Sequence, residues 1–198
     1  RMHQAVNQFI SDAIYAGQLQ CHHGNNHQVI PVPAGYCGLL DQPAGVLFIP
    51  VEHEGNTQAS EEEVDQIAEL ANELLTRTFT DKAGQSRPIG WDDMLFVAPY
   101  NHQVNYLKQA MPQARVGSVD RFQGQEAPVV FFSLCTSDAA EAPRGIDFLY
   151  EKNRINVAIS RAQALAIVVG NPALFSTPVN SLGQMEKVNV LARLEGYV

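Results

Sequence analysis

Five short apolar runs, none of them broken by regular polar alternation, constrain the fold of this chain more than any other feature. They are "GVLFIPV", "MLFVAPY", "ARVGSV", "PVVFFSLC" and "ALAIVVGNP", which begin at residues 45, 94, 114, 128 and 164. Segments with the apolar spacing of helices separate them, most clearly residues 60–79. Strands without alternation are typical of a parallel sheet that helices cover on both faces. The sequence therefore predicts a single α/β domain with a mainly parallel sheet and helices on both sides.

Composition sets the broad class of the chain. It has 198 residues and a formal net charge of −8, which suits one domain with a sizeable core. This charge argues against wholesale electrostatic binding to nucleic acid, but it is compatible with a local track of contacts. No apolar run approaches the ~20 residues that span a bilayer. The three cysteines, Cys21, Cys37 and Cys135, show no framework spacing, so we expect no membrane partner and a cytoplasmic location.

The stretch "VGSVDRFQGQEAPVVFFS" places polar residues between two apolar strands. Ser118 offers a hydroxyl, Gln123 an amide and Glu126 a carboxylate, and Gly124 permits close approach of the backbone. Turns at strand ends are where open α/β sheets place ligands. On spacing alone, however, a turn whose polar groups satisfy exposed backbone is the favoured interpretation.

The stretch "NRINVAISRAQ" predicts a helix with one buried face. That face consists of Ile155, Ala158, Ile159 and Ala162. Arg154 and Arg161 are seven residues apart and are expected on nearly the same side of this helix, beside the buried face. Taken alone, Arg161 is best explained as a cation near a helix C-terminus, which is favourable by roughly 0.3–1 kcal/mol. The alternative is an arginine beside a cleft, where its planar fork binds phosphate oxygens.

Together, four segments in order resemble the second RecA-like domain of superfamily 1 helicases. They are "RMHQAVNQFISDAIYAGQL", "VAPYNHQV", "GSVDRFQGQE" and "NRINVAISRAQ", the last three resembling motifs IV, V and VI. The resemblance is closer to the branch that includes the RNA helicase of nonsense-mediated decay and the nuclease-helicase of Okazaki-fragment processing. Bacterial members of that branch often carry a fused RecB-like nuclease. The resemblance runs from residue 1 to about residue 172 and implies a RecA-like three-layer sandwich.

The resemblance implies roles for individual residues. Arg1 and Arg161 match arginines that reach the γ-phosphate of ATP as arginine fingers, which are worth roughly 10³–10⁵ in rate in other NTPases. Glu126 matches an acid that binds the nucleotide ribose, and Gln123 and Gly124 belong to the same turn. The positions that match the nucleic-acid track are Pro99, Tyr100, Ser118 and Val119.

Two departures from the family pattern stand out. His3-Gln4 replaces the usual His-Pro, which we expect only to soften the start of the first helix. Gln163 stands where a second basic residue is common, so a supporting phosphate contact or interdomain contact is expected to be lost.

The chain contains neither a G-x-x-x-x-G-K-[ST] loop nor an acidic Walker B partner. We therefore expect ATP and Mg²⁺ to be held mainly by a first RecA-like domain of the same polypeptide, and the isolated chain to be inactive as an ATPase. Residues 1–20 would lead in from that domain, residues 176–198 would form a C-terminal extension, and the start at Arg1 without an initiator methionine suggests a piece of a longer protein.

The expected substrate is single-stranded DNA, on the resemblance to the bacterial fusions. The alternatives are an RNA helicase, a catalytically silent nucleic-acid or protein docking module with this fold, and a nucleotide-binding protein of another α/β type. The absent phosphate loop weighs against the last of these.

Several other polar groups have simple explanations. The first turn of a helix accounts for Glu61, Glu62 and Glu63, with Glu63 completing a capping box begun by Ser60. His53 is expected in an exposed loop. A solvated loop is also expected for the cysteines and histidines that match no zinc-site spacing, namely Cys21, His22, His23, His27 and Cys37.

Basic and aromatic residues are interleaved in "APRGIDFLYEKN", which includes Arg144, Phe148 and Lys152. A loop folded onto the core and a loop facing nucleic acid are equally supported there.

Overall fold

The central element of the computed structural model is a five-stranded parallel sheet with the order β1-β7-β6-β4-β5. The structure describes residues 2–143, 145, 148, 151–177, 185, 189–190 and 192–194. All five predicted strands are present. Their bounds are β1 (Gly45–Pro50), β4 (Met94–Ala98), β5 (Arg115–Ser118), β6 (Ala127–Ser133) and β7 (Ala162–Gly170).

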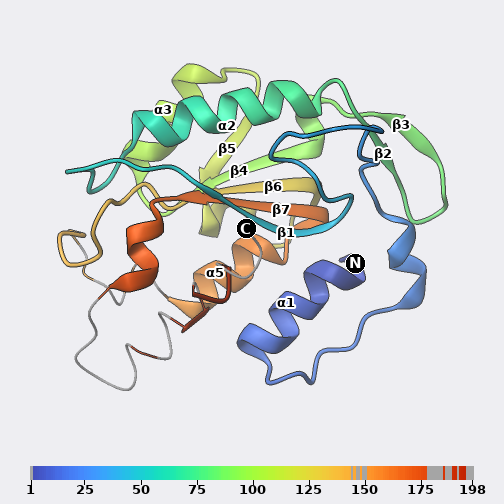
Figure 1. The fold of residues 1–198 in the computed structure, drawn as a ribbon, viewed down its shortest axis with the longest axis horizontal. Coiled ribbons are helices and arrows are strands. Elements are labelled where there is room, and N and C mark those ends of the chain that lie inside the picture. Colours follow the sequence, from blue (N-terminus) through green and yellow to red (C-terminus); the bar gives the residue numbers. More distant parts are fainter. Residues whose placement is uncertain are drawn as a thin grey trace.

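Helices cover both faces of this sheet (Figure 1). The helices α2 (Glu61–Leu74) and α3 (Asn101–Ala110) lie on one face, and α1 (Gln4–Ile14) and α5 (Lys152–Ile159) lie on the other. This arrangement is a RecA-like three-layer α/β fold, which confirms the predicted fold class.

The two helical layers explain why the strands are apolar throughout. Side chains of a strand point alternately to opposite faces of the sheet. In β1, Val46 and Phe48 join the core on the side of α1 and α5, whereas Leu47 and Ile49 join the core under α2 and α3. A strand with an apolar core on each side has no solvent face on which a polar residue would be favourable.

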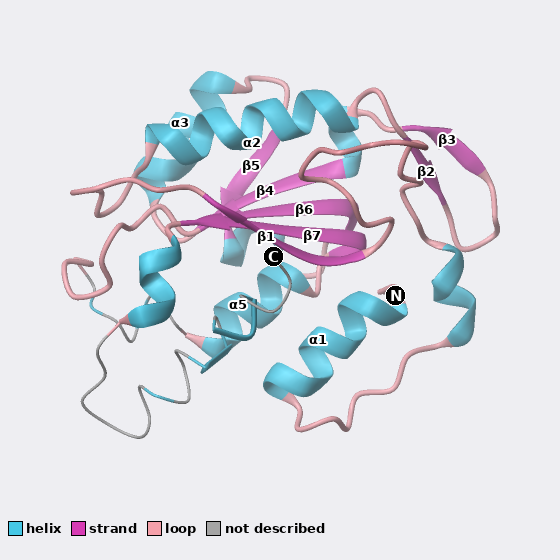
Figure 2. Ribbon diagram, viewed as in Figure 1, coloured by secondary structure: helices cyan, strands magenta, loops and turns pink. Residues whose placement is uncertain are grey.

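Outside the sheet, a short antiparallel hairpin and four 3₁₀ helices complete the described elements (Figure 2). The hairpin consists of β2 (Thr78–Thr80) and β3 (Ser86–Pro88). The prediction that one helix runs through residues 60–79 is wrong at its end, because Thr78–Thr80 pairs with Ser86–Pro88 instead. The 3₁₀ helices are η1 (His23–His27), η2 (Trp91–Asp93), η3 (Val119–Phe122) and η4 (Pro172–Ser176).

Part of the predicted C-terminal extension belongs to the same core. Residues 185, 189–190 and 192–194 are helical. Val190 and Leu194 are buried in the core on the side of α1 and α5. No helix in the described part of the chain has the length and apolar character required to cross a membrane.

Candidate nucleotide and nucleic-acid sites

The segments that resemble motifs V and VI meet at the amino ends of β6 and β7. Ala127, the first residue of β6, pairs with Ala162, the first residue of β7. Just before this pair, the Ala127 N–H donates to the Arg161 carbonyl oxygen at 3.0 Å. The turn at 123–126 and Arg161 are therefore held side by side by the start of the sheet.

Arg161 is half-buried, and several hydrogen bonds hold its guanidinium, among them a contact of 3.5 Å from Nη2 to the Ser160 hydroxyl. Its Nε donates to the Val157 carbonyl oxygen at 3.0 Å. Its Nη1 makes a longer contact, 3.5 Å, with the carbonyl oxygen of Gln125 in the exposed turn. The arginine that matches the motif VI finger thus contacts the turn that matches motif V.

One expectation about this region is wrong. The helix ends at Ile159, so Arg161 is not on it, and Arg154 and Arg161 are not two turns apart on one helical face. The cause is the pairing of Ala162 with Ala127, which requires extended backbone from that residue onward. The turn at 123–126 stands where the sequence predicts it, between the end of β5 and the start of β6.

Gln163 occupies the place of the expected basic residue and has a contact of its own. Its Nε2 donates to the Glu126 carboxylate at 3.0 Å. The Gln163 carbonyl oxygen accepts from the His3 N–H at 2.7 Å, which brings the start of α1 to the same edge. His3 also caps α1, because its Nδ1 accepts from the Ala5 N–H at 3.1 Å. Arg1 lies outside the described residues.

The residues assigned to the nucleic-acid track lie at the opposite end of the strands, at and just after the carboxyl ends of β4 and β5. Pro99, Tyr100 and Ser118 line a cavity of about 370 Å³, which we call the track cavity. Its volume falls within the range usual for ligand sites, roughly 300–1,000 Å³. Val119 is buried, so this residue offers its backbone rather than its side chain. The first residues of α3, Asn101 and His102, also line the cavity.

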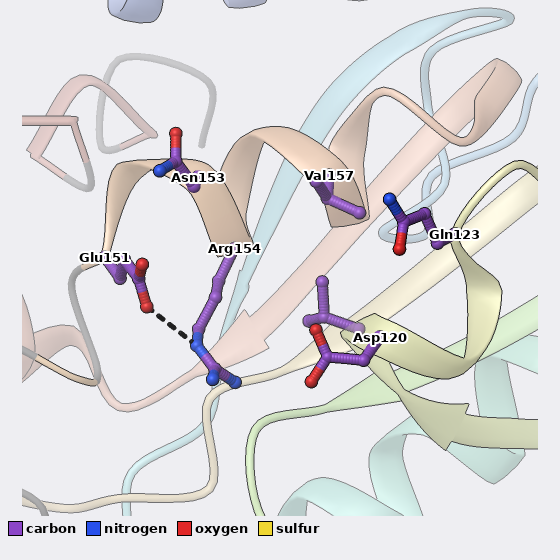
Figure 3. A pocket seen from close by; sticks show the side chains of 7 residues that line it. Asp120, Gln123, Glu151, Asn153, Arg154 and Val157 are labelled. Carbon is purple, nitrogen blue, oxygen red and sulfur yellow. Dashed lines mark hydrogen bonds and ion pairs between the residues drawn. The ribbon is translucent and has the colours of Figure 1, made fainter.

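A smaller cavity of about 180 Å³ lies between η3 and α5 (Figure 3). Gln123 and Asn153 line this cavity and do not line the track cavity. Asp120 and Arg154 line both this cavity and the track cavity, so they form the wall between the two. The smaller cavity therefore connects the region of the track to the start of the exposed turn.

An acidic cavity of about 540 Å³ opens at the carboxyl ends of β1 and β7. Four carboxylates line it, from Glu52, Glu54, Asp138 and Glu141. A phosphate backbone is repelled by such a cluster. The track cavity, which Arg154 lines, is the more favourable of the two for a polyanion.

A buried polar network beside this acidic cavity overturns two predictions. His53 was expected to be exposed, but it is buried between Ser137, at 2.7 Å from Nδ1, and Glu63, at 3.0 Å from Nε2. Glu63 has no exposed surface. Its carboxylate also accepts from the Ser133 hydroxyl at 2.6 Å and from the Cys135 N–H at 2.9 and 3.0 Å.

The predicted capping box is consequently only half formed. The Ser60 hydroxyl accepts from the Glu63 N–H, as expected, but the Ser60 N–H donates to Gln103 Oε1 at 2.8 Å. The sequence does hold a signal for the burial of Glu63. This residue stands four, seven and eleven positions before Ile67, Leu70 and Leu74, on the apolar face of α2.

Cys135 is not a candidate nucleophile. Burial raises the pKa of its thiol well above the usual range, and the nearby Glu63 carboxylate acts in the same direction. Among the described residues, no group of three or more histidine, cysteine or acidic side chains is placed to hold a metal ion.

Comparison with known proteins identifies the family of the chain. Residues 1–173 match a family described as an AAA domain. The chain belongs to this family. It is 30% identical over 173 residues to DNA-binding protein SMUBP-2 of Rattus norvegicus, which covers 85% of this chain and 17% of the relative. It is 30% identical over 211 residues to the putative regulator of nonsense transcripts 1 of Takifugu rubripes, covering 96% and 18%.

A third relative is named as a helicase. The chain is 33% identical over 131 residues to putative helicase mov-10-B.1 of Danio rerio, covering 58% of this chain and 13% of the relative. These relatives confirm the resemblance to superfamily 1 helicases at the level of the family. The chain spans less than a fifth of the length of each of the three.

Proposed function

We propose that residues 1–198 are the second RecA-like motor domain of an ATP-dependent DNA helicase of superfamily 1. One observation carries this proposal: Arg161 contacts the turn that contains Gln123, Gly124 and Glu126, although more than 30 residues separate them in the sequence. Residues that match two nucleotide-contacting motifs thus form one surface. A protein that kept the fold only for docking would not require this convergence.

In this proposal, ATP binds between this surface and a first RecA-like domain that holds the phosphates and Mg²⁺. The Glu126 carboxylate, oriented by Gln163, is the acceptor for ribose hydroxyls. The Arg161 guanidinium, oriented by the Val157 carbonyl oxygen, stabilises the charge that develops as the γ-phosphoryl leaves. Arg1 is the second proposed finger.

Closure around ATP and opening after hydrolysis would alternate the grip on a single strand at the track cavity. Pro99, Tyr100, Ser118 and the backbone of Val119 supply contacts that take phosphates or sugars without reading bases. The result is translocation along the strand and unwinding of a duplex.

The motif pattern is our reason for placing the chain in the branch that includes the nonsense-mediated-decay helicase and the Okazaki nuclease-helicase. The likeness to bacterial nuclease-helicase fusions is our reason for proposing DNA as the substrate. The name of one relative, DNA-binding protein SMUBP-2, agrees with that substrate. A RecB-like nuclease on the same polypeptide is part of this proposal.

The test is to replace Arg161 by Ala and by Lys in the full-length protein. Turnover of ATP should fall by about 10³-fold or more for Arg161→Ala, while binding of a fluorescent ATP analogue and of oligo(dT) stays within about twofold of wild type. Arg161→Lys retains the charge but loses the bond from Nε to Val157, so its turnover should stay close to that of the alanine variant.

Lys82→Ala is the matched control, because it removes one positive charge from the exposed turn of the β2–β3 hairpin. It should leave turnover unchanged. Wild-type turnover in Arg161→Ala would refute the finger assignment.

A further inference from the structure

The side chain of Arg154 is held in place at the wall between the track cavity and the smaller cavity. Its Nε donates to the Glu151 carboxylate at 2.9 Å. Its guanidinium carbon lies 4.2 Å from the centre of the Phe148 ring. Phe148 in turn packs on Tyr100, with 5.4 Å between ring centres. The side chain of Arg154 is only 24% exposed, so the guanidinium is both oriented and partly shielded from water.

The bond to Glu151 leaves the far edge of the guanidinium unoccupied. Arginine offers five N–H donors in a planar fork, and only the one on Nε makes a hydrogen bond to a described residue. Within the described residues, neither Nη1 nor Nη2 makes a hydrogen bond. Figure 3 shows the fork reaching from α5 into the space between Glu151 and Asp120. An arginine can bind one acceptor at Nε and a second, bidentately, through its two Nη atoms.

The surroundings of this free edge fit a phosphate. Arg154 lines the track cavity together with Ser118 and the first residues of α3. A hydroxyl, backbone N–H groups at a helix start and a preorganised guanidinium are the donors that proteins use for phosphate oxygens. Arg154 is also the only arginine or lysine on the wall of the track cavity among the described residues.

We propose that Arg154 binds a backbone phosphate of the single strand in the track cavity, with Glu151 and Phe148 as the residues that orient it. This inference rests on the proposed function. Because the contact is to phosphate, it applies equally to DNA and RNA strands. Glu151 keeps its bond to Nε when the phosphate binds, so no ion pair has to break for the strand to enter.

The experiment measures binding of fluorescein-labelled oligo(dT) and oligo(U) to the full-length protein over a series of salt concentrations. Arg154→Gln should weaken both by about tenfold, the scale of one charge-assisted contact. It should also lower the slope of log affinity against log salt by about 0.7, the value for one phosphate on a single strand. Lys82→Gln removes the same charge elsewhere and should change neither quantity.

Glu151→Gln separates phosphate binding from a structural ion pair. If Arg154 serves only to pair with Glu151, both variants should lose affinity to the same extent. If Arg154 binds phosphate, Glu151→Gln should match wild type or bind more tightly, because the amide oxygen of Gln still accepts from Nε and orients the guanidinium, while a carboxylate near the strand is removed. Arg154→Lys, which keeps the charge without the fork, should retain the salt slope with reduced affinity even if Arg154→Gln does not fold.

Wild-type affinity and slope in Arg154→Gln would overturn this inference alone, provided that the wild-type protein shows nucleic-acid-dependent ATPase activity. Equal losses in Arg154→Gln and Glu151→Gln would overturn it as well. A wild-type protein that binds neither oligonucleotide would overturn both this inference and the proposed function. A loss restricted to oligo(dT) or to oligo(U) would show that the contact is not to phosphate.

Discussion

Replacement of Glu63 by Leu should destabilise the fold by about 3–5 kcal/mol, the cost of breaking a buried charged network. The side chain has no exposed surface, and its carboxylate accepts from Ser133, Cys135 and His53. Leucine has a similar volume but no acceptor. Each buried donor that it leaves without a partner costs about 1–3 kcal/mol. Three such donors set an upper bound of about 9 kcal/mol, which partial rearrangement reduces.

Glu63→Gln should be milder, at about 1–3 kcal/mol, because one oxygen remains as an acceptor for the Cys135 N–H. The amide that replaces the other oxygen meets the Ser133 hydroxyl, which already accepts from Gln103 Nε2 at 2.9 Å. The order of stability is therefore expected to be wild type, then the Gln variant, then the Leu variant.

The assay is urea unfolding of the 198-residue chain followed by circular dichroism, with the free energy extrapolated to water. Glu61→Gln is the control, since Glu61 stands in the same helical turn but is exposed. It should stay within about 0.5 kcal/mol of wild type. A Leu variant within 1 kcal/mol of wild type would refute the claim that this carboxylate ties α2 to the end of β6.

Two further predictions concern single positions. A Cβ at Gly170 would lie 2.7 Å from Leu134 Cδ1 and 3.0 Å from Leu134 Cβ. Gly170→Ala should therefore lower the free energy of unfolding by about 1–3 kcal/mol through overpacking. In urea unfolding, the double variant with Leu134→Ala should lose less stability than the sum of the two single losses. Burial lowers the pKa of His3, whose neutral ring caps α1. The unfolded chain therefore binds this proton more readily than the folded chain does. The stability that His3 contributes is present above about pH 6.5 and is lost as the pH falls below that value. His3→Asn keeps a capping acceptor without titrating, so unfolding between pH 7 and pH 5 should depend less on pH than in wild type, and an unchanged dependence would contradict this reasoning.

The fold followed from the sequence because its signals are local and repeated. Each strand is a continuous apolar run, and each helix on the sheet has an apolar face, so β1, β4, β6 and β7 were found close to their true bounds. The exception was the segment after Leu74. There, a hairpin replaces the end of the predicted helix, and its strands have only three residues each. Such short strands carry too few residues to show a period.

The candidate site was predictable only in part, because its geometry depends on contacts between distant segments. Arg161 and Glu126 were identified by resemblance, but spacing alone could not show that pairing of β6 with β7 joins them. The network of His53, Glu63 and Ser137 was missed for the same reason. His53 contacts Glu63, which is ten residues away, and Ser137, which is 84 residues away. Charged and polar residues are ordinarily solvated, so the burial of all three runs against the usual preference.

The two proposed sites lie at opposite ends of the strands of the sheet, and η3 and α5 lie between them. The 3₁₀ helix η3 begins after Ser118, which lines the track cavity, and ends before Gln123 in the nucleotide surface. The helix α5 carries Arg154, which lines the track cavity, and ends two residues before Arg161 in the nucleotide surface. Val119 and Phe122 of η3 share one core with the buried face of α5. A close-packed core transmits a displacement rather than absorbing it. A phosphate that shifts Arg154 would therefore also shift the helix that leads to Arg161, which gives the proposed motor a physical route from strand binding to ATP hydrolysis.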